Sequence, residues 1–406
     1  MKRSESTRSA IAGKYIVVVV VVVALAVAVG YGGLASKSTT SSTSTSAAQA
    51  AISTSSSASS TSSSTVSTAL SSSSAVPLTL PISPPTNNSV STIRIGYFAN
   101  LNHAPAVIGL SNGDFQQFVG PSTKIQTTLF TSGSPEMTSL LANKIDIAYV
   151  GPSPAVNAFL ASNGSALQIV SGVANGGAVF VVRNASNINS VKDFGGKTFA
   201  APGVGNTQDI ALRHYLLQNG YNVAPAGNVT VEDTSNANIV TLMEKGQIDG
   251  AWVPEPWGAI LVAEAGGHIF LNEASLWPSG FSTTELVVST SFLKAHPDVV
   301  KEVVEANLYE TQWIQNNPLQ AAVTLNNVLG NLTGGAIGLP IVQAAMTRLS
   351  FTDSPLGPSV LQQAQNAFAL DDLGTTAPTV QSISGLYNLA ILNSILEEYG
   401  LPQVSN

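Results

Sequence analysis

The chain has 406 residues, with 16 Lys or Arg, 23 Asp or Glu and no cysteine. Residues 93–406 carry 11 basic and 22 acidic side chains, and so acidic a surface excludes nucleic acid and anionic lipid as general partners. The lack of cysteine excludes disulfides, a lipid-modified N-terminal cysteine and a thiol nucleophile.

A basic segment followed by an apolar run opens the chain. Residues 1–15 carry four Lys or Arg against one Glu, and residues 16–35 contain no charged side chain. About twenty uncharged residues are long enough to cross a bilayer, and the basic flank stays in the cytoplasm. We therefore predict a transmembrane helix or uncleaved signal anchor at 16–35, a cytoplasmic flank at 1–15, and an extracellular location for everything that follows.

The next segment, residues 36–91, is dominated by Ser, Thr and Ala up to Pro85 and has one charged side chain, Lys37. This composition cannot build a core, so we predict a disordered stalk. Asn-x-Ser/Thr sequences predict a glycoprotein, although a chain rich in these residues also forms them by chance. They begin at Asn87, Asn163, Asn184, Asn228 and Asn331.

From residue 92 onward, predicted strands alternate with predicted helices. The predicted strands are 93–97, 124–130, 145–150, 167–172, 178–183, 197–201, 229–231, 248–253 and 284–289. The predicted helices are 105–110, 134–143, 153–160, 207–218, 239–245, 297–316, 319–329, 340–349, 359–370 and 386–399. Such alternation predicts an α/β protein with mostly parallel sheets flanked by helices.

One passage occurs twice. The sequence IDIAYVGPSP at 145–154 is repeated as IDGAWVPEP at 248–256, each time after an amphipathic stretch and with prolines that open a helix. The repeat predicts two similar lobes with a ligand-binding cleft between them. We predict lobe I at 92–180 and 285–406, the second part mostly helical, and lobe II at 181–284.

Four loops lead from the carboxyl end of a predicted strand into a helix: 131–135, 151–154, 203–207 and 253–256. Ser or Asn suits the cap of such helices, and Pro suits the first turn. The free N–H groups and the dipole of a helix start bind oxyanions without Lys or Arg. Ligands of open α/β sheets lie at this edge. The alternative is that these residues only cap their helices.

The candidate ligand-binding residues lie in these loops or beside them. They are Asn100, His103, Ser132, Gly133, Ser134, Tyr149, Ser153, Asn206, Thr207, Gln208, Trp252 and Glu255. Trp252 is predicted at the cleft, where it can stack on an alkyl chain, with Tyr149 as its counterpart in lobe I. His103 either faces the cleft or is a surface residue. Glu255 either is stabilised by a helix dipole or pairs with a ligand amine. We predict no catalytic residue, metal or cofactor.

Several short motifs resemble those of the nitrate/sulfonate/taurine-type solute-binding proteins of ABC importers. They are GYF at 96–98, NHAPA at 102–106, SGS at 132–134, DIAYVG at 146–151, GNTQD at 205–209 and WVPEPW at 252–257. The resemblance implies a two-lobed periplasmic-binding-protein-like fold of type II that closes on its ligand by a hinge. It also implies an ABC permease and its ATPase as partners. The anchor and stalk resemble the arrangement in archaeal relatives.

We therefore expect a monomeric, membrane-anchored binding protein for a small organic anion, an alkanesulfonate or taurine. Nitrate or another small oxyanion is an alternative ligand, and so is an uncharged pyrimidine or vitamin precursor. A desulfinase-like enzyme is disfavoured because its cysteine nucleophile is missing and no Ser-His-acid order or metal-ligand cluster replaces it. A surface adhesin is disfavoured by the repeated helix-start loops.

Overall fold

The computed structural model describes residues 82, 88, 90–223, 227–370 and 377–406. The chain divides into two units, Met1–Ser71 and Ser72–Asn406, and all elements described below belong to the second. The predicted transmembrane helix at 16–35 and nearly all of the predicted stalk lie outside the described residues. No helix among the residues just given has the length and apolar character that a membrane span requires.

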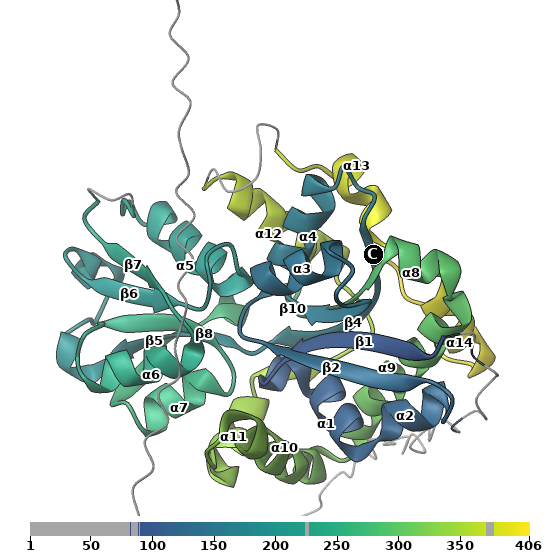
Figure 1. The fold of residues 1–406 in the computed structure, drawn as a ribbon. Coiled ribbons are helices and arrows are strands. Elements are labelled where there is room, and N and C mark those ends of the chain that lie inside the picture. Colours follow the sequence, from purple (N-terminus) through teal and green to yellow (C-terminus); the bar gives the residue numbers. More distant parts are fainter. Residues whose placement is uncertain (1–81, 83–87, 89, 224–226, 371–376) are drawn as a thin grey trace, which may run out of the picture. The chain divides into compact units, whose positions relative to one another are not determined.

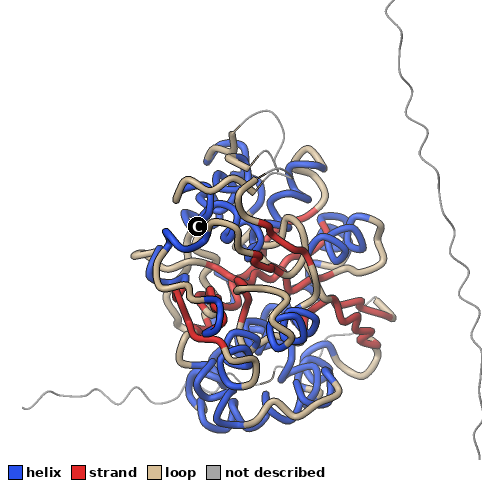
Figure 2. Tube along the Cα trace, turned by 90° about the vertical axis from the view of Figure 1, so that its left-hand side faces the viewer, coloured by secondary structure: helices blue, strands red, loops and turns tan. Residues whose placement is uncertain are grey.

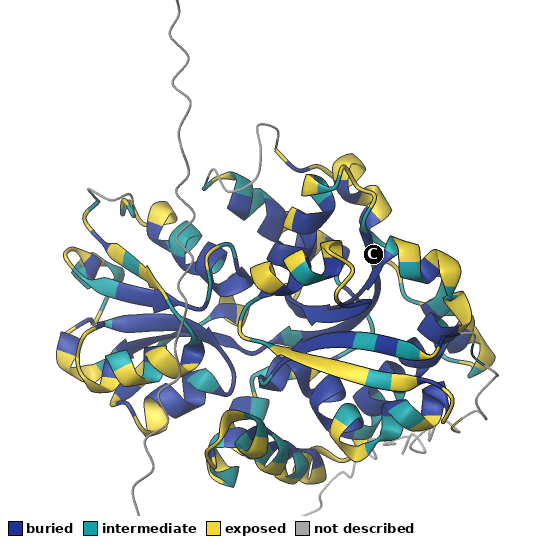
Figure 3. Ribbon diagram, in the orientation of Figure 1, coloured by how far each residue is buried: buried dark blue, intermediate teal, exposed yellow. Residues whose placement is uncertain are grey.

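Lobe I is built on a six-stranded sheet in the order β11-β4-β10-β3-β1-β2 (Figure 1). Its strands are β1 Thr92–Phe98, β2 Lys124–Phe130, β3 Ile147–Val150, β4 Leu167–Gly176, β10 Ser282–Ser289 and β11 Leu349–Phe351. The edge strand β2 is largely exposed, whereas the strands inside the sheet are buried (Figure 3).

Lobe II is built on a five-stranded sheet in the order β7-β6-β8-β5-β9. Its strands are β5 Ala178–Arg183, β6 Thr198–Ala201, β7 Thr230–Asp233, β8 Gly250–Pro254 and β9 Gly267–Asn272. Reversed, this order is β9-β5-β8-β6-β7, and each strand then corresponds to one in β4-β10-β3-β1-β2 of lobe I. The repeated sequence passage forms β3 in one lobe and β8 in the other, at the same place in each sheet.

The two-lobed α/β fold predicted from the sequence is confirmed, and most strands of each sheet run in one direction, with antiparallel exceptions. β1 runs parallel to β2 and β3, and β6 runs parallel to β7 and β8. β10 and β5 run antiparallel to both of their neighbours. Each of them follows a crossing between the lobes, so each enters its sheet from the edge at which the parallel strands end.

Helices surround the strands (Figure 2). In lobe I they are α1 Ala104–Asn112, α2 Asp114–Val119, α3 Gly133–Leu141, α4 Pro152–Ala161, α8 Thr290–Ala295, α9 Pro297–Asn316, α10 Pro318–Thr333, α11 Leu339–Met346, α12 Gly357–Phe368, α13 Val380–Ile383 and α14 Ala390–Glu398. In lobe II they are α5 Thr207–Gln218, α6 Asn236–Glu244 and α7 Trp257–Ala263. Short 3-10 helices include η1 Leu101–His103 and η4 Glu273–Leu276.

Both faces of each sheet are covered, which explains why the central strands are apolar without interruption. In β3, Ile147 and Tyr149 join one core cluster, and Ala148 and Val150 join another. In β8, Trp252 likewise belongs to a different cluster from its two neighbours in the chain.

The chain crosses between the lobes twice. The first crossing is at Gly176 and Gly177, whose φ angles of +72° and +73° suit glycine. The second is the segment 273–281, which contains η4. The lobe boundaries predicted at 180/181 and 284/285 fall inside β5 and β10.

Candidate functional site

The helix-start loops of the two lobes touch each other directly. The amide N–H of Gly133, at the start of α3, donates to Asn206 Oδ1 at 2.8 Å, and Ser134 Oγ donates to the carbonyl of Val204 at 3.1 Å. Gly151, just before α4, lies so close to Thr207 that a Cβ placed on it would fall within 3.0 Å of the Thr207 hydroxyl. The loops identified from the sequence therefore form one contact between α3 and α4 of lobe I and α5 of lobe II.

A second contact joins the loop between β8 and α7 to lobe I. The N–H of Leu101 donates to the carbonyl of Glu255 at 2.8 Å. Trp257 Nε1 donates to Asn100 Oδ1 at 2.7 Å, and Arg348 Nε donates to Glu255 Oε1 at 2.6 Å. These three bonds hold lobe II against η1 and against the residue that precedes β11.

A small cavity of about 20 Å³ lies between the two contacts. It is lined by Phe98, Asn100, Asn102, His103, Thr131, Gly151, Pro202, Asn206, Thr207, Gln208, Asn236, Pro254 and Thr283. Apart from Thr283 on β10, these residues end or follow parallel strands in both sheets, at the edge where ligands of α/β proteins bind. The volume suffices for about one water molecule. None of these lining residues is Lys, Arg, Asp or Glu.

Several polar atoms at this cavity have no hydrogen-bond partner among the described residues. Asn102 Oδ1, Thr207 Oγ1 and Asn236 Oδ1 belong to lining residues, and the buried Ser153 Oγ lies in the first turn of α4. A buried polar atom without a partner costs about 1–3 kcal/mol, so folded proteins keep few of them. Their concentration here indicates a wall that is suited to hydrogen-bond a polar ligand.

Capping does not explain the polar residues at the helix starts. Neither Ser132, before α3, nor Asn206, before α5, makes a side-chain cap to its own helix. Asn206 instead reaches across to Gly133 in the other lobe. Asp209 supports its own loop, because its carboxylate accepts the N–H of Gly205 at 3.0 Å and pairs with Arg213 at 2.6 Å. The positive ends of α4 and α5 therefore meet at the cavity without a carboxylate on its wall.

His103 is a neutral hydrogen-bonding group in this wall. It is buried, its ring packs 4.5 Å from that of Phe98, and its Nδ1 accepts the N–H of Phe98 at 3.4 Å. Burial lowers the pKa of His103 to about 3. Because Nδ1 accepts a hydrogen bond, we assign the proton of the neutral ring to Nε2, which is thereby a donor.

Two aromatic residues predicted at the cleft lie elsewhere. Trp252 is fully buried in the core of lobe II, stacked 5.4 Å from Phe180, and its Nε1 donates to Glu273 at 2.6 Å. Tyr149 is fully buried against Phe115 in the core of lobe I. The placement of both at the cleft was wrong, because strands buried on both faces direct alternate side chains into two cores and neither core faces the cleft.

The side chain of Glu255 is also not part of the cavity lining. Its buried carboxylate accepts from Arg348 at 2.6 Å and from the N–H of Ala259, in the first turn of α7, at 3.0 Å. Burial raises its pKa, and Arg348 opposes that rise. The carboxylate therefore supports a helix start and joins the two lobes, and it does not line the small cavity.

The structure thus sorts the candidate residues into three groups. Those that line the cavity are Asn100, His103, Asn206, Thr207 and Gln208. Those at the lobe contact or buried beside it are Ser132, Gly133, Ser134 and Ser153. The remaining three lie elsewhere: Tyr149 and Trp252 pack in a hydrophobic core, and Glu255 forms an ion pair with Arg348.

Four polar residues of the wall are absent from the candidate ligand-binding residues predicted from the sequence: Asn102, Thr131, Asn236 and Thr283. Asn102 is two residues from Asn100, and its amide donates to Thr284 Oγ1 at 2.7 Å. Asn236 starts α6 just after β7, and the strand-to-helix rule applied to the other loops would have found it. Thr283 lies on the crossing strand β10, for which no local signal exists. Among the described residues, no group of three acidic, His or Cys side chains could hold a metal ion.

The sequence is similar to a known protein family and to two named binding proteins. Residues 86–326 match the NMT1-like family. A Bacillus subtilis (strain 168) protein, named provisionally as an aliphatic sulfonates-binding protein, is 26% identical over 240 residues, which are 58% of this chain and 69% of that protein. The nitrate/nitrite binding protein NrtA of Nostoc sp. strain PCC 7120 is 28% identical over 109 residues, which are 27% of this chain and 24% of that protein.

Two solved structures share the fold. The alkanesulfonate-binding protein SsuA from Xanthomonas axonopodis pv. citri, bound to MOPS, has a TM-score of 0.60 at 20% identity, covering 72% of this chain and 97% of that chain. The periplasmic nitrate-binding protein NrtA from Synechocystis PCC 6803 has a TM-score of 0.67 at 13% identity, covering 78% and 91%. The resemblance stated from the sequence motifs is confirmed.

Proposed function

From the premise that this chain belongs to the NMT1-like family, we propose that it is the extracytoplasmic substrate-binding component of an ABC importer. It captures a small organic anion, an alkanesulfonate or taurine, between its lobes and delivers it to the permease and its ATPase. The supporting relatives carry sulfonate or nitrate in their names. The N-terminal anchor and the glycosylation remain predictions from the sequence.

The observation that carries this proposal is the meeting of helix N-termini from both lobes at a neutral polar wall. α4 and α5 direct their first turns toward the cavity, and neither has a side-chain cap. Pro152 and Pro154 carry no N–H, so the first turn of α4 offers the N–H of Ser153, and the first turn of α5 offers more. These N–H groups and the helix dipoles stabilise an anion without a countercharge. The hydroxyl of Thr207 supplies a further donor to the anion, whereas the unpartnered atoms of Asn102 and Asn236 are amide oxygens, which suit a donor on the ligand such as the amine of taurine.

Closure of the lobes couples binding to recognition by the permease. An anion that contacts α4 of lobe I and α5 of lobe II favours the arrangement in which both contacts exist, because a ligand shifts an equilibrium only through differential affinity. The crossings at Gly176–Gly177 and 273–281 are the segments about which the lobes can move.

Nitrate is the second candidate ligand. The small volume of the cavity, about 20 Å³, favours a compact ion over one with a long organic tail. The nitrate-binding relatives support the same choice.

Calorimetric titration with taurine, ethanesulfonate, sulfate, nitrate and bicarbonate tests the proposal. We expect a sulfonate to bind most tightly, and a preference for nitrate would select the second candidate. Asn206→Ala should weaken the best ligand on the order of tenfold or more, because it removes the bond to Gly133 and an amide of the wall. The exposed Asn189→Ala is the matched control and should bind normally. If no anion of the panel binds, the proposal is wrong.

A further inference from the structure

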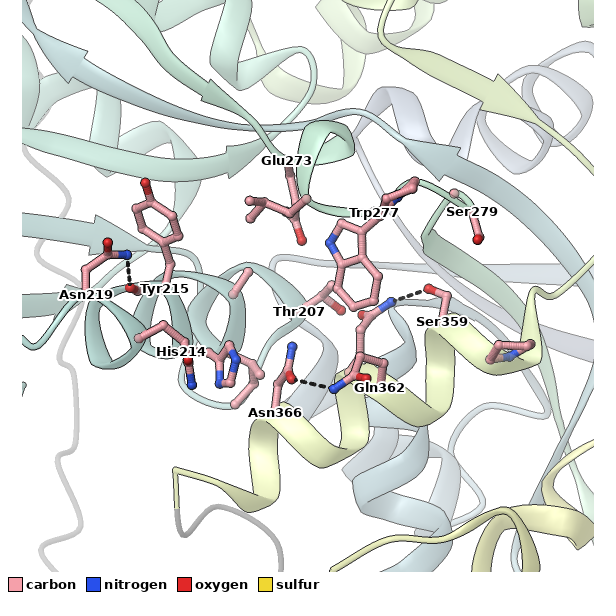
Figure 4. Close-up of a pocket in the computed structure, with 18 residues that line it drawn as sticks. Thr207, His214, Tyr215, Asn219, Glu273, Trp277, Ser279, Ser359, Gln362 and Asn366 are labelled. Carbon is pink, nitrogen blue, oxygen red and sulfur yellow. Dashed lines mark hydrogen bonds between the residues drawn. The ribbon is translucent and has the colours of Figure 1, made fainter. Parts of the chain in front are cut away.

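A larger pocket lies beside the cleft and is not explained by anion binding. Its volume is about 630 Å³, in the range of small-molecule sites. It lies between α5 of lobe II, α12 of lobe I and the segment 273–280, and we call it the flank pocket (Figure 4). Thr207, at the start of α5, lines both this pocket and the small cavity.

Two aromatic rings form rigid surfaces of the flank pocket. The half-buried Trp277 stacks on Phe281, with ring centroids 5.7 Å apart and planes inclined by 20°. Tyr215 packs edge-on against Trp252 at 5.6 Å. Because these contacts already hold both rings, a ligand that packs on their free surfaces orders little additional side chain. Aromatic faces of this kind suit the C–H surface of a flat ligand.

The polar part of the lining includes five primary amides. They are Gln218, Asn219, Gln362, Gln363 and Asn366. The amide of Gln362 donates to Asn366 Oδ1 at 3.1 Å, and that of Asn219 donates to the carbonyl of Tyr215 at 2.8 Å. An amide offers two N–H donors and an oxygen with two lone pairs. The amides in these two hydrogen bonds therefore still have a donor and an acceptor that a ligand can use. Ligand hydroxyls, which both donate and accept, match this lining.

The charge at the flank pocket argues against an ion as its ligand. None of the described lining residues is Lys or Arg, and burial lowers the pKa of the lining His214, so an anion would find no countercharge. The carboxyl of Glu273 is buried and accepts Trp252 Nε1 at 2.6 Å. Figure 4 shows the Glu273 carboxyl and the Trp277 indole turned toward each other. Burial raises the pKa of Glu273 to about 7 and the two indoles oppose that rise, so a cation would find a carboxyl that already accepts an indole N–H and is only partly ionised.

We propose that the flank pocket binds a neutral polyhydroxylated molecule of the size of a mono- or disaccharide. The sugar ring packs on Trp277 and Tyr215, and its hydroxyls bond the amides of α5 and α12. This site adjoins the anion site through Thr207, and its ligand contacts both lobes.

The test is saturation-transfer NMR and calorimetry on the full-length chain with glucose, maltose and trehalose, and with choline as the cationic comparison. At least one sugar should bind. Gln362→Ala, at an exposed position, should weaken it two- to tenfold, and Trp277→Ala should weaken it about tenfold, with Trp277→Phe restoring part of the loss. Ser153→Ala, buried beside the small cavity and outside the flank pocket, should leave sugar binding unchanged.

Separate outcomes apply to the two sites. Weakened anion binding in Ser153→Ala with intact sugar binding supports a flank-pocket site that is distinct from the small cavity. Absence of binding by every sugar at millimolar concentration, sugar binding that survives both flank-pocket substitutions, or binding of choline in place of the sugars would overturn the inference. Failure of the anion panel would instead count against the proposed importer function alone.

Discussion

Adding one methyl group at Gly151 should hold the two lobes apart. Gly151 precedes α4 with φ −67° and ψ 153°, a conformation that alanine adopts without strain. The new Cβ would lie within 3.0 Å of Thr207 Oγ1 across the lobe boundary. Because non-bonded heavy atoms prefer about 3.5–4.0 Å, the lobes must separate locally by roughly an ångström.

The cost of this separation follows from the contacts that it disturbs. The bond from Gly133 N–H to Asn206 Oδ1, now 2.8 Å, would lengthen to about 3.8 Å and cease to be a hydrogen bond. One extra methyl group in a packed interface costs about 1–3 kcal/mol. Because each lobe folds on its own core, we expect this cost in closure, and therefore an anion affinity about five- to 150-fold weaker.

Calorimetry with ethanesulfonate, or with nitrate if the panel selects it, measures the affinity. The lobe separation can be measured with spin labels, since the chain has no cysteine and Lys144→Cys and Glu232→Cys place one exposed label on each lobe. The ligand should shorten this distance in the parent chain and shorten it less in Gly151→Ala.

A thermodynamic cycle provides the control. In a Thr207→Ala background the nearest remaining atom to the new methyl group is Cβ of residue 207, at 3.4 Å, an ordinary contact. Gly151→Ala should therefore cost little there. Parent-like affinity and lobe distance in Gly151→Ala, or an equal cost in both backgrounds, would refute the reasoning.

Three further outcomes are expected. Deleting residues 1–85 should leave a soluble monomer with unchanged anion affinity in calorimetry, because the deleted composition builds no core; insolubility or lost binding would contradict this. Glu255→Gln should weaken taurine and ethanesulfonate by the same factor, below about tenfold, because the carboxylate meets Arg348 and not the cavity; a loss confined to taurine would return it to a ligand role. Burial, reinforced by the side chain of Asp114, raises the pKa of Glu310 to about 9 from an ordinary 4.5. The folded state thus holds a proton that the unfolded state has lost, so this stabilisation is complete below pH 4.5 and is lost as pH rises to 9, by at most about 1.4 kcal/mol per pH unit. Thermal melting from pH 5 to 9 should show a flatter profile for Glu310→Gln; an unchanged profile would contradict it.

Sequence patterns identified the long and periodic elements well. α9, α5 and β2 have the bounds that the pattern predicts, because a helix of several turns or a paired strand repeats its signal many times. The strands β9 and β11 and the helices α2 and α8 were not predicted. They are short, and β11 has three residues whose pairing with β4 depends on tertiary contacts.

The site was predictable where its chemistry lies in local loops. Glycine, serine and proline between a strand and a helix marked the starts of α3, α4 and α5, and these starts do meet. The direction of side chains was not predictable, because both faces of β3 and β8 are buried and periodicity cannot then distinguish core from cleft. Thr283 and the partnership of Glu255 with Arg348 depend on residues far apart in the chain.

The speed of ligand capture follows from how closely the two lobes touch. A cavity with room for about one water admits an anion only after the lobes part. The observed binding rate should then rise with anion concentration only until opening limits it, and level off at the opening rate. Weakening the contact, as in Asn206→Ala, should raise that plateau even while it lowers affinity. When solute is abundant, the importer would load at a pace set by the protein's own motion.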